Sequence, residues 1–161
     1  MAEIKAPYSA SDVAKWFIWR NRIEENDEAE KMTLLKLLKL LYYAEGCSLA
    51  LNDKSLFDET IEAWEHGSVV PEIYAKYHDD PYNLPFNEDD SCIAEKFCPE
   101  DSECLEQVFQ VFGAYSAWAL RNKTHQETPW LEATKNGSSL KHPISRKIMK
   151  DYFLKTYVEE S

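Results

Sequence analysis

The side chains best suited to acid–base chemistry lie in two short segments. His125 and Glu127 stand two residues apart, and His66 directly follows Glu65. A histidine beside a carboxylate can transfer protons near neutral pH, but a histidine in a loop also commonly serves as a hydrogen-bonding group that fixes the loop. The sequence therefore leaves two interpretations open: a small enzyme, such as a hydrolase or transferase, that uses His125 and Glu127, or a structural role for both pairs.

Other enzyme signatures are missing from the sequence. It contains no glycine-rich phosphate loop, no G-x-S-x-G elbow and no H-E-x-x-H zinc helix. The cysteines do not form the closely spaced ligand pairs of structural zinc sites, since Cys92, Cys98 and Cys104 are six residues apart and Cys47 stands alone. We therefore expect free thiols, no cofactor and no metal, with a zinc site as the alternative interpretation of the cysteines.

The charge of the chain is strongly acidic and unevenly distributed. The formal net charge is −11 over 161 residues, and residues 79–106 carry ten acidic side chains against one lysine. Residues 135–155 reverse the balance, with six basic side chains against one aspartate. An acidic total argues against direct nucleic-acid binding. The acidic segment is interpreted as a solvated loop, with two alternatives: a docking surface for a basic partner, or a decoy that imitates nucleic acid to inhibit such a partner.

One leucine-rich stretch must position all of these groups. From Thr33 to Leu51 the sequence reads TLLKLLKLLYYAEGCSLAL, and its apolar side chains cover almost the whole circumference of a helix. Such a helix must be enclosed by the rest of the chain. Two lysines and Glu45 interrupt it, so we do not expect it to span a membrane. Thr33 is the expected N-cap.

The remaining segments also favour helices. Leu, Ala, Glu and Lys are common and glycine is rare, so the predicted fold class is predominantly all-α: a compact single domain over residues 1–161 around the helix at about 33–51. The N-terminus shows no signal peptide, which predicts a cytoplasmic protein with no membrane partner. Further helices are expected at residues 9–26, 71–77, 99–121, 128–136 and from 143 onward.

Two segments are less regular. Phe57, Ile61 and Trp64 have helical spacing, and a short strand at residues 61–65 is the minor alternative. Residues 78–98 contain prolines and the acidic run, so we expect an acidic surface excursion there, with a short helix or strand near 91–97.

Several side chains could bind a partner. Lys36, Lys39 and Tyr43 form the one polar strip of the central helix. This strip is either its wetted edge or an anchor for carboxylates, which Glu62 or Glu65 of the same chain or a partner could supply. Tryptophans are enriched both in cores and at interface hot spots, so both interpretations apply to the set Trp64, Trp118 and Trp130.

Four blocks of sequence carry a resemblance to a known family. They are LLKLLKLLYYAEG at residues 34–46, LFDETIEAW at 56–64, HGSVVPEIY at 66–74 and THQETPW at 124–130. In this order they resemble the Panacea domain of SocA-like and GepA-like antitoxins and phage-associated proteins, over about residues 8–155. The family usually has Gly-Pro-Val where this chain has Gly67-Ser68-Val69, and the acidic excursion is not part of its motif.

The resemblance implies a mostly helical, non-enzymatic antitoxin. Such a domain binds and neutralises a toxin protein, and some members act as adaptors that deliver the toxin to a protease. The expected partner is therefore a cognate toxin, encoded by the adjacent gene, with a protease as second partner in the adaptor case. Some relatives carry a DNA-binding helix-turn-helix ahead of the domain; only a handful of residues precede it here, so no operator binding is expected. Besides the acidic segment, the side chains expected to contact the partner are Lys36, Lys39, Tyr43, Trp64, His125 and Trp130.

Overall fold

The computed structural model describes residues 5–24 and 31–158. They form a predominantly helical protein, as the composition predicts. The helices are α1 (Ala10–Glu24), α2 (Leu34–Asn52), α3 (Pro71–Tyr77), α4 (Pro99–Phe112), α5 (Ala117–Thr124), α6 (Thr128–Ala133) and α7 (Arg146–Phe153). A π-helical turn at Leu154–Val158 continues α7, and 3₁₀ turns occupy Glu88–Asp90 and Ile93–Lys96. Among the described helices, none combines the length and apolar character needed to cross a bilayer.

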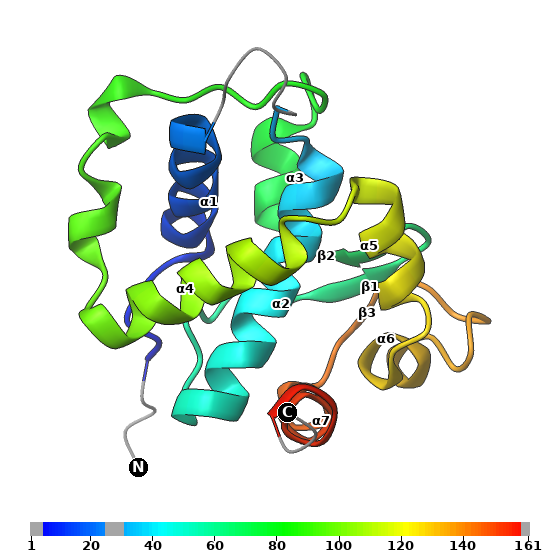
Figure 1. The fold of residues 1–161 in the computed structure, drawn as a ribbon. Coiled ribbons are helices and arrows are strands. Elements are labelled where there is room, and N and C mark those ends of the chain that lie inside the picture. Colours follow the sequence, from blue (N-terminus) through cyan, green and yellow to red (C-terminus); the bar gives the residue numbers. More distant parts are fainter. Residues whose placement is uncertain (1–4, 25–30, 159–161) are drawn as a thin grey trace.

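The leucine-rich helix α2 is the centre of the fold. It begins at the predicted cap, since the Thr33 side chain accepts a hydrogen bond from the Lys36 backbone N–H. In Figure 1, α4 crosses in front of α2, α1 lies beside it and α7 lies at its lower end. Most of its residues are buried, including the side chains that sequence analysis assigned to its polar strip. The prediction of a central, enclosed helix is confirmed.

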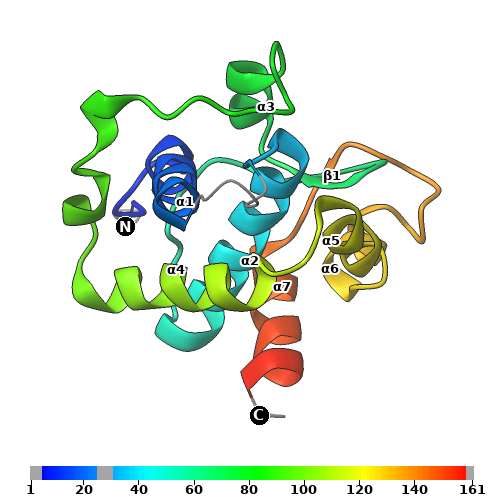
Figure 2. The same cartoon turned by 45° about the horizontal axis from the view of Figure 1, so that its top comes forward.

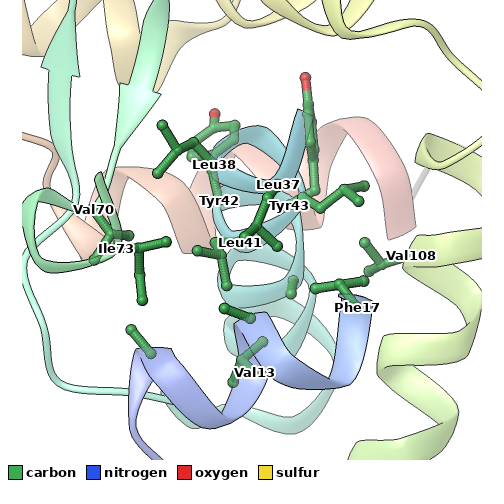
Figure 3. Close-up of a cluster of buried hydrophobic side chains, with 14 of the residues drawn as sticks. Val13, Phe17, Leu37, Leu38, Leu41, Tyr42, Tyr43, Val70, Ile73 and Val108 are labelled. Carbon is green, nitrogen blue, oxygen red and sulfur yellow. The ribbon is translucent and has the colours of Figure 1, made fainter. Parts of the chain in front are cut away.

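The core forms where α1, α3 and α4 meet α2. Val13 and Phe17 of α1 face Leu37 and Leu41 of α2, and Val108 of α4 completes this side (Figure 3). All five side chains are at most 1% exposed. Because such burial contributes about 1.5 to 3 kcal/mol per large apolar side chain, these contacts fix the helices around α2.

Helix α7 approaches α2 at a glycine and is held there by a buried ion pair. A Cβ atom at Gly46 would lie 2.4 Å from the Phe153 ring, so only glycine allows this approach. One helical position earlier, the buried Glu45 carboxylate accepts a hydrogen bond from Arg146 Nε at 2.8 Å. The same guanidinium donates to the carbonyls of Phe57 and Glu59, at 3.0 and 2.8 Å. This single side chain therefore joins α7, α2 and the connection before the sheet.

A small antiparallel sheet lies beside the helices, with strand order β2-β1-β3. The strands are β1 (Glu62–Trp64), β2 (Gly67–Val69) and β3 (His142–Pro143). The minor alternative of a strand at 61–65 is thus confirmed, and the helical spacing of Phe57, Ile61 and Trp64 is misleading. The hairpin turns at Glu65 and His66, and the first residue of β2, Gly67, has a φ of +110° that disfavours any other residue.

The predicted continuous helix from 99 to 121 is wrong, because the chain breaks between α4 and α5. Ser116 caps α5 by accepting a hydrogen bond from the Ala119 N–H at 3.0 Å. The carbonyl of Gly113 accepts a hydrogen bond from Lys36 Nζ at 2.6 Å instead of continuing the helix. These two hydrogen bonds replace those of a continuous helix. As a result α5 turns toward the sheet, as both views show (Figures 1 and 2).

The acidic excursion at residues 78–98 passes along the outer side of α1 (Figure 2). It is anchored by three buried apolar side chains, Leu84, Ile93 and Phe97. Its backbone also holds the start of α2, since Leu34 N–H donates to the Pro81 carbonyl at 2.7 Å. The short helix expected near 91–97 is present as the 3₁₀ turn Ile93–Lys96. The predicted end of the first helix at residue 26 lies outside the described residues.

Candidate functional site

An apolar hollow lies between the sheet, the N-terminal half of α2 and the start of α5. Its volume is about 670 Å³. We call it the aromatic groove; it is lined by Thr33, Leu34, Leu35, Leu38, Lys39, Trp64, Glu65, His66, Val69, Tyr74, Pro81, Tyr82, Ala117, Trp118, Leu140 and Lys141. This volume is in the range of pockets that bind small molecules or anchor side chains of a partner protein.

The rim of the groove concentrates exposed apolar surface. Eight large hydrophobic side chains are exposed in the described part of the chain, and four of them line this groove. They are Tyr74, Trp118, Tyr82 and Leu140, with exposed fractions from 41% to 80%. Contiguous exposed apolar surface of this kind marks interaction sites in soluble proteins. Trp118 is therefore a surface residue, which corrects the core interpretation of this tryptophan.

Trp64 is held at one wall of the groove by contacts on each side. Its indole N–H donates to Glu62 Oε1 at 2.8 Å, and its ring lies 5.2 Å from the ring of Tyr74. The ammonium group of Lys141 lies 4.8 Å from the centre of the Trp64 ring. Behind the strand, the Trp130 indole donates to the Trp64 carbonyl at 3.0 Å. The wall is thus fixed in shape before any ligand arrives.

Cationic groups border the same hollow. The guanidinium of Arg121 stacks on Trp118 at 4.4 Å, and Arg121 Nε donates to His66 Nδ1 at 3.4 Å. Together with Lys141, this arginine places positive charge next to exposed aromatic rings.

Lys39 forms part of the floor and is completely buried. Its ammonium donates to the Ser68 carbonyl at 3.0 Å, and its stem lies beneath Gly67, where a Cβ would be 2.5 Å from Lys39 Cε. Burial, with a smaller contribution from the charge of Arg121, lowers the pKa of Lys39 to about 7. The carboxylates of Glu62 and Glu65 do not pair with it in the described structure. The hydroxyl of Ser68, also buried, has no hydrogen-bond partner there.

Comparison with known protein families gave a match over the middle of the chain. Residues 37–131, more than half of the chain, match the family described as Antitoxin SocA-like, Panacea domain. The chain belongs to this antitoxin family. Comparison with the curated proteins and with the solved structures gave no match. The matched part of the Panacea domain runs from α2 through α6 and contains the hairpin, α3 and α5.

The Panacea domain places the six side chains expected to contact a partner at different depths. Tyr43 is fully buried, and Lys36 and Trp130 are 8% and 7% exposed. The wetted-edge interpretation of the strip is therefore wrong. Trp64 and His125 are half-buried, and only Lys39 and Trp64 of the six line the aromatic groove.

The Panacea domain does not bring His125 and Glu127 together as a catalytic pair. His125 Nε2 is hydrogen-bonded to the Glu65 carbonyl at 2.5 Å, and burial lowers the pKa of His125. Glu127 faces the other way, where its carboxylate accepts a hydrogen bond from the Tyr157 hydroxyl. It is 2% exposed, and burial raises its pKa. Each side chain fixes the local structure, and membership of an antitoxin family favours a non-enzymatic role.

The structure also shows how the other candidate residues lie. Cys47, Cys92, Cys98 and Cys104 are all free thiols. In the described ranges, no group of three or more His, Cys, Asp or Glu side chains lies close enough to hold a metal ion. Part of the acidic segment is neutralised within the chain, because Arg20 pairs with Glu106.

The sequence does not predict several side chains that shape this site, among them Tyr74, Tyr82, Leu140 and Lys141 in the groove and Arg121 at its border. They come from α3, α5 and two loops, and no single periodicity joins them. The only available signal was the presence of aromatic residues in polar surroundings, as at Tyr82 between Pro81 and Asn83.

Proposed function

We propose that this protein is an antitoxin that neutralises a cognate toxin by binding it directly through the aromatic groove. The antitoxin family supports the role in general, and implies a toxin as partner. The observation that carries the proposed surface is the clustering of exposed Tyr74, Tyr82, Trp118 and Leu140 around one hollow.

The residue types in the groove are those that dominate protein interfaces. Tryptophan, tyrosine and arginine supply most of the binding energy at interface hot spots. Here Trp118 and Arg121 are stacked on each other and Trp64 is held by its neighbours. Because these side chains are already ordered, a partner would pay little conformational entropy to bind them.

In this proposal, binding covers the active or target-binding surface of the toxin. No enzymatic step by the antitoxin is needed, which agrees with the separate structural roles of His125 and Glu127. Delivery of the toxin to a protease remains the alternative mechanism. Occlusion predicts that protection persists in cells that lack the major cytosolic proteases, whereas delivery predicts that it is lost.

The proposal is tested by co-expression with the adjacent reading frame. We expect the neighbouring protein to stop growth when expressed alone and to be tolerated with this chain. Trp118→Ala should abolish protection, while Tyr115→Ala, which removes another exposed aromatic three residues away and outside the groove, should retain it. A neighbour that is harmless alone contradicts the antitoxin proposal. Equal protection by both variants contradicts the assignment of the groove.

A further inference from the structure

The electrostatic character of the aromatic groove is opposite to that of the molecule. The whole chain has a net charge of −11. The groove, in contrast, has Lys141 in its wall and Arg121 at its border, against Trp118 and His66. Among the described residues that line the groove, the only carboxylate belongs to Glu65. Glu62, next to the wall, has a carboxylate oxygen engaged by the Trp64 indole.

Some cations elsewhere in the described structure have carboxylate partners from the same chain. Lys15 pairs with Asp90, Lys54 with Asp101 and Arg146 with Glu45. Arg121 and Lys141, at the groove, form no ion pair within the described residues; their neighbours are aromatic rings, an imidazole and the side chain of Asn122. Other described lysines, such as Lys135 and Lys147, also lack an ion pair, but Arg121 and Lys141 both lie against aromatic rings of the same hollow, which suits an apolar ligand with an anionic group.

We propose that the aromatic groove binds an apolar segment of the partner protein that carries a carboxylate, with the carboxylate at the cationic border formed by Arg121 and Lys141. This inference names the chemistry of the partner and rests on the function proposed above. The apolar side chains of the segment would pack on Trp64, Tyr74 and Trp118. The carboxylate would accept hydrogen bonds from the guanidinium, which recognises carboxylates in a planar, two-pronged geometry.

The aromatic rings and the cations support each other in this arrangement. Arg121 is held over Trp118 and Lys141 over Trp64, so both charges are oriented without a carboxylate being present. A bound apolar segment would exclude water from this region and strengthen the charge interaction. Acidic side chains without neighbouring apolar ones would gain only the weak attraction of exposed ion pairs.

The chemistry can be tested without the partner by means of two fluorescent probes. The probe 8-anilinonaphthalene-1-sulfonate is apolar and anionic, and N-phenyl-1-naphthylamine is nearly the same molecule without the charge. We expect Arg121→Gln combined with Lys141→Gln to weaken sulfonate binding about ninefold to twenty-five-fold, at about threefold to fivefold per cation. Binding of the neutral probe should change less than twofold. The matched control, Lys135→Gln with Lys147→Gln, removes two exposed charges outside the groove and should leave both probes unaffected.

Equal loss of sulfonate binding in the control, or no loss in the groove variant, would overturn the proposal. The control also excludes a nonspecific effect of net charge, because each double variant removes two positive charges and makes the net charge more negative by the same amount.

A second measurement uses the toxin itself and separates this inference from the proposed function. Once the adjacent gene product is shown to be neutralised, Arg121→Glu with Lys141→Glu should abolish neutralisation, and Lys135→Glu with Lys147→Glu should not. If the unmodified chain fails to protect at all, the proposed function is wrong. If it protects and the groove variant protects equally, only the inference about a carboxylate-bearing segment is wrong. Vesicles of phosphatidylglycerol test the alternative ligand. If the protein binds them through Arg121 and Lys141, and these residues have no effect on neutralisation, the ligand of the groove is a lipid and not a protein segment.

Discussion

Replacing Lys39 with methionine tests the central electrostatic feature of the groove floor. Methionine keeps a similar length beneath Gly67 and removes the charge. Lys39 is 0% exposed, and burial together with Arg121 lowers its pKa from the ordinary 10.5 to about 7. Between these two values the unfolded chain holds a proton at this position and the folded protein does not. The folded state therefore becomes more stable relative to the unfolded state as the pH rises.

The magnitude follows from the pKa values. This group contributes a rise of about 1.4 kcal/mol per pH unit in the free energy of unfolding between pH 7 and pH 10.5. From pH 7.5 to 9, the unmodified protein should therefore gain about 2 kcal/mol relative to Lys39→Met. Below pH 7 the lysine is protonated in both states, so the two proteins should respond to pH in parallel.

The assay is urea unfolding at a series of pH values, with the difference between the two proteins plotted against pH. All other titrating groups are shared, so subtraction isolates Lys39. The loss of the hydrogen bond to the Ser68 carbonyl adds an offset of about 1 kcal/mol that varies little with pH. Lys147→Met, at an exposed position, is the control and should give a flat difference. A flat difference for Lys39→Met as well would refute the reasoning that burial holds this amine neutral.

Three further substitutions test the framework around α2 by urea unfolding. Gly46→Ala should destabilise the protein by about 1 to 3 kcal/mol because the new Cβ meets the Phe153 ring. Phe153→Leu in the same chain should recover part of that loss. Equal stability of Gly46→Ala and the unmodified protein would contradict this packing. Arg146→Ala should lower the free energy of unfolding by about 3 kcal/mol, because it leaves the buried Glu45 carboxylate without its cation. Glu45→Gln in the same chain should reduce that loss. A loss no larger than that from replacing an exposed arginine would count against this ion pair. Ser116→Ala should cost about 1 kcal/mol through loss of the α5 cap, whereas no change would show that the break after α4 does not depend on it.

The central features of the fold could be predicted from local sequence. The run of leucines in α2 predicts an enclosed helix because no other arrangement buries side chains around its whole circumference. Thr33 predicts where it begins. The break between α4 and α5 could not be predicted in the same way, because the Lys36 side chain that binds the Gly113 carbonyl comes from 77 residues earlier in the chain. The third strand likewise depends on a pairing between β1 and residues 142–143.

The candidate site was only partly accessible to sequence analysis. Lys39 and Trp64 were chosen from their residue types, and both line the groove. The polar strip of α2 was interpreted by helical geometry alone, which gives the direction of a side chain but not what covers it; here the hairpin covers Lys39. Arg121 and Trp118 were expected on one long helix, and the turn after Gly113 is what brings them to the sheet.

If the groove binds the partner as proposed, the third strand affects which partner fits. Leu140 and Lys141 reach the groove because β3 pairs with β1, yet they lie beyond the matched residues 37–131. Lys135 to Ser138 before them are exposed, and a replacement loop needs only residues that tolerate the positive φ of Lys135, Asn136 and Gly137. An engineer could therefore exchange residues 135–141 as a cassette to retarget the antitoxin, leaving the leucine-rich scaffold untouched.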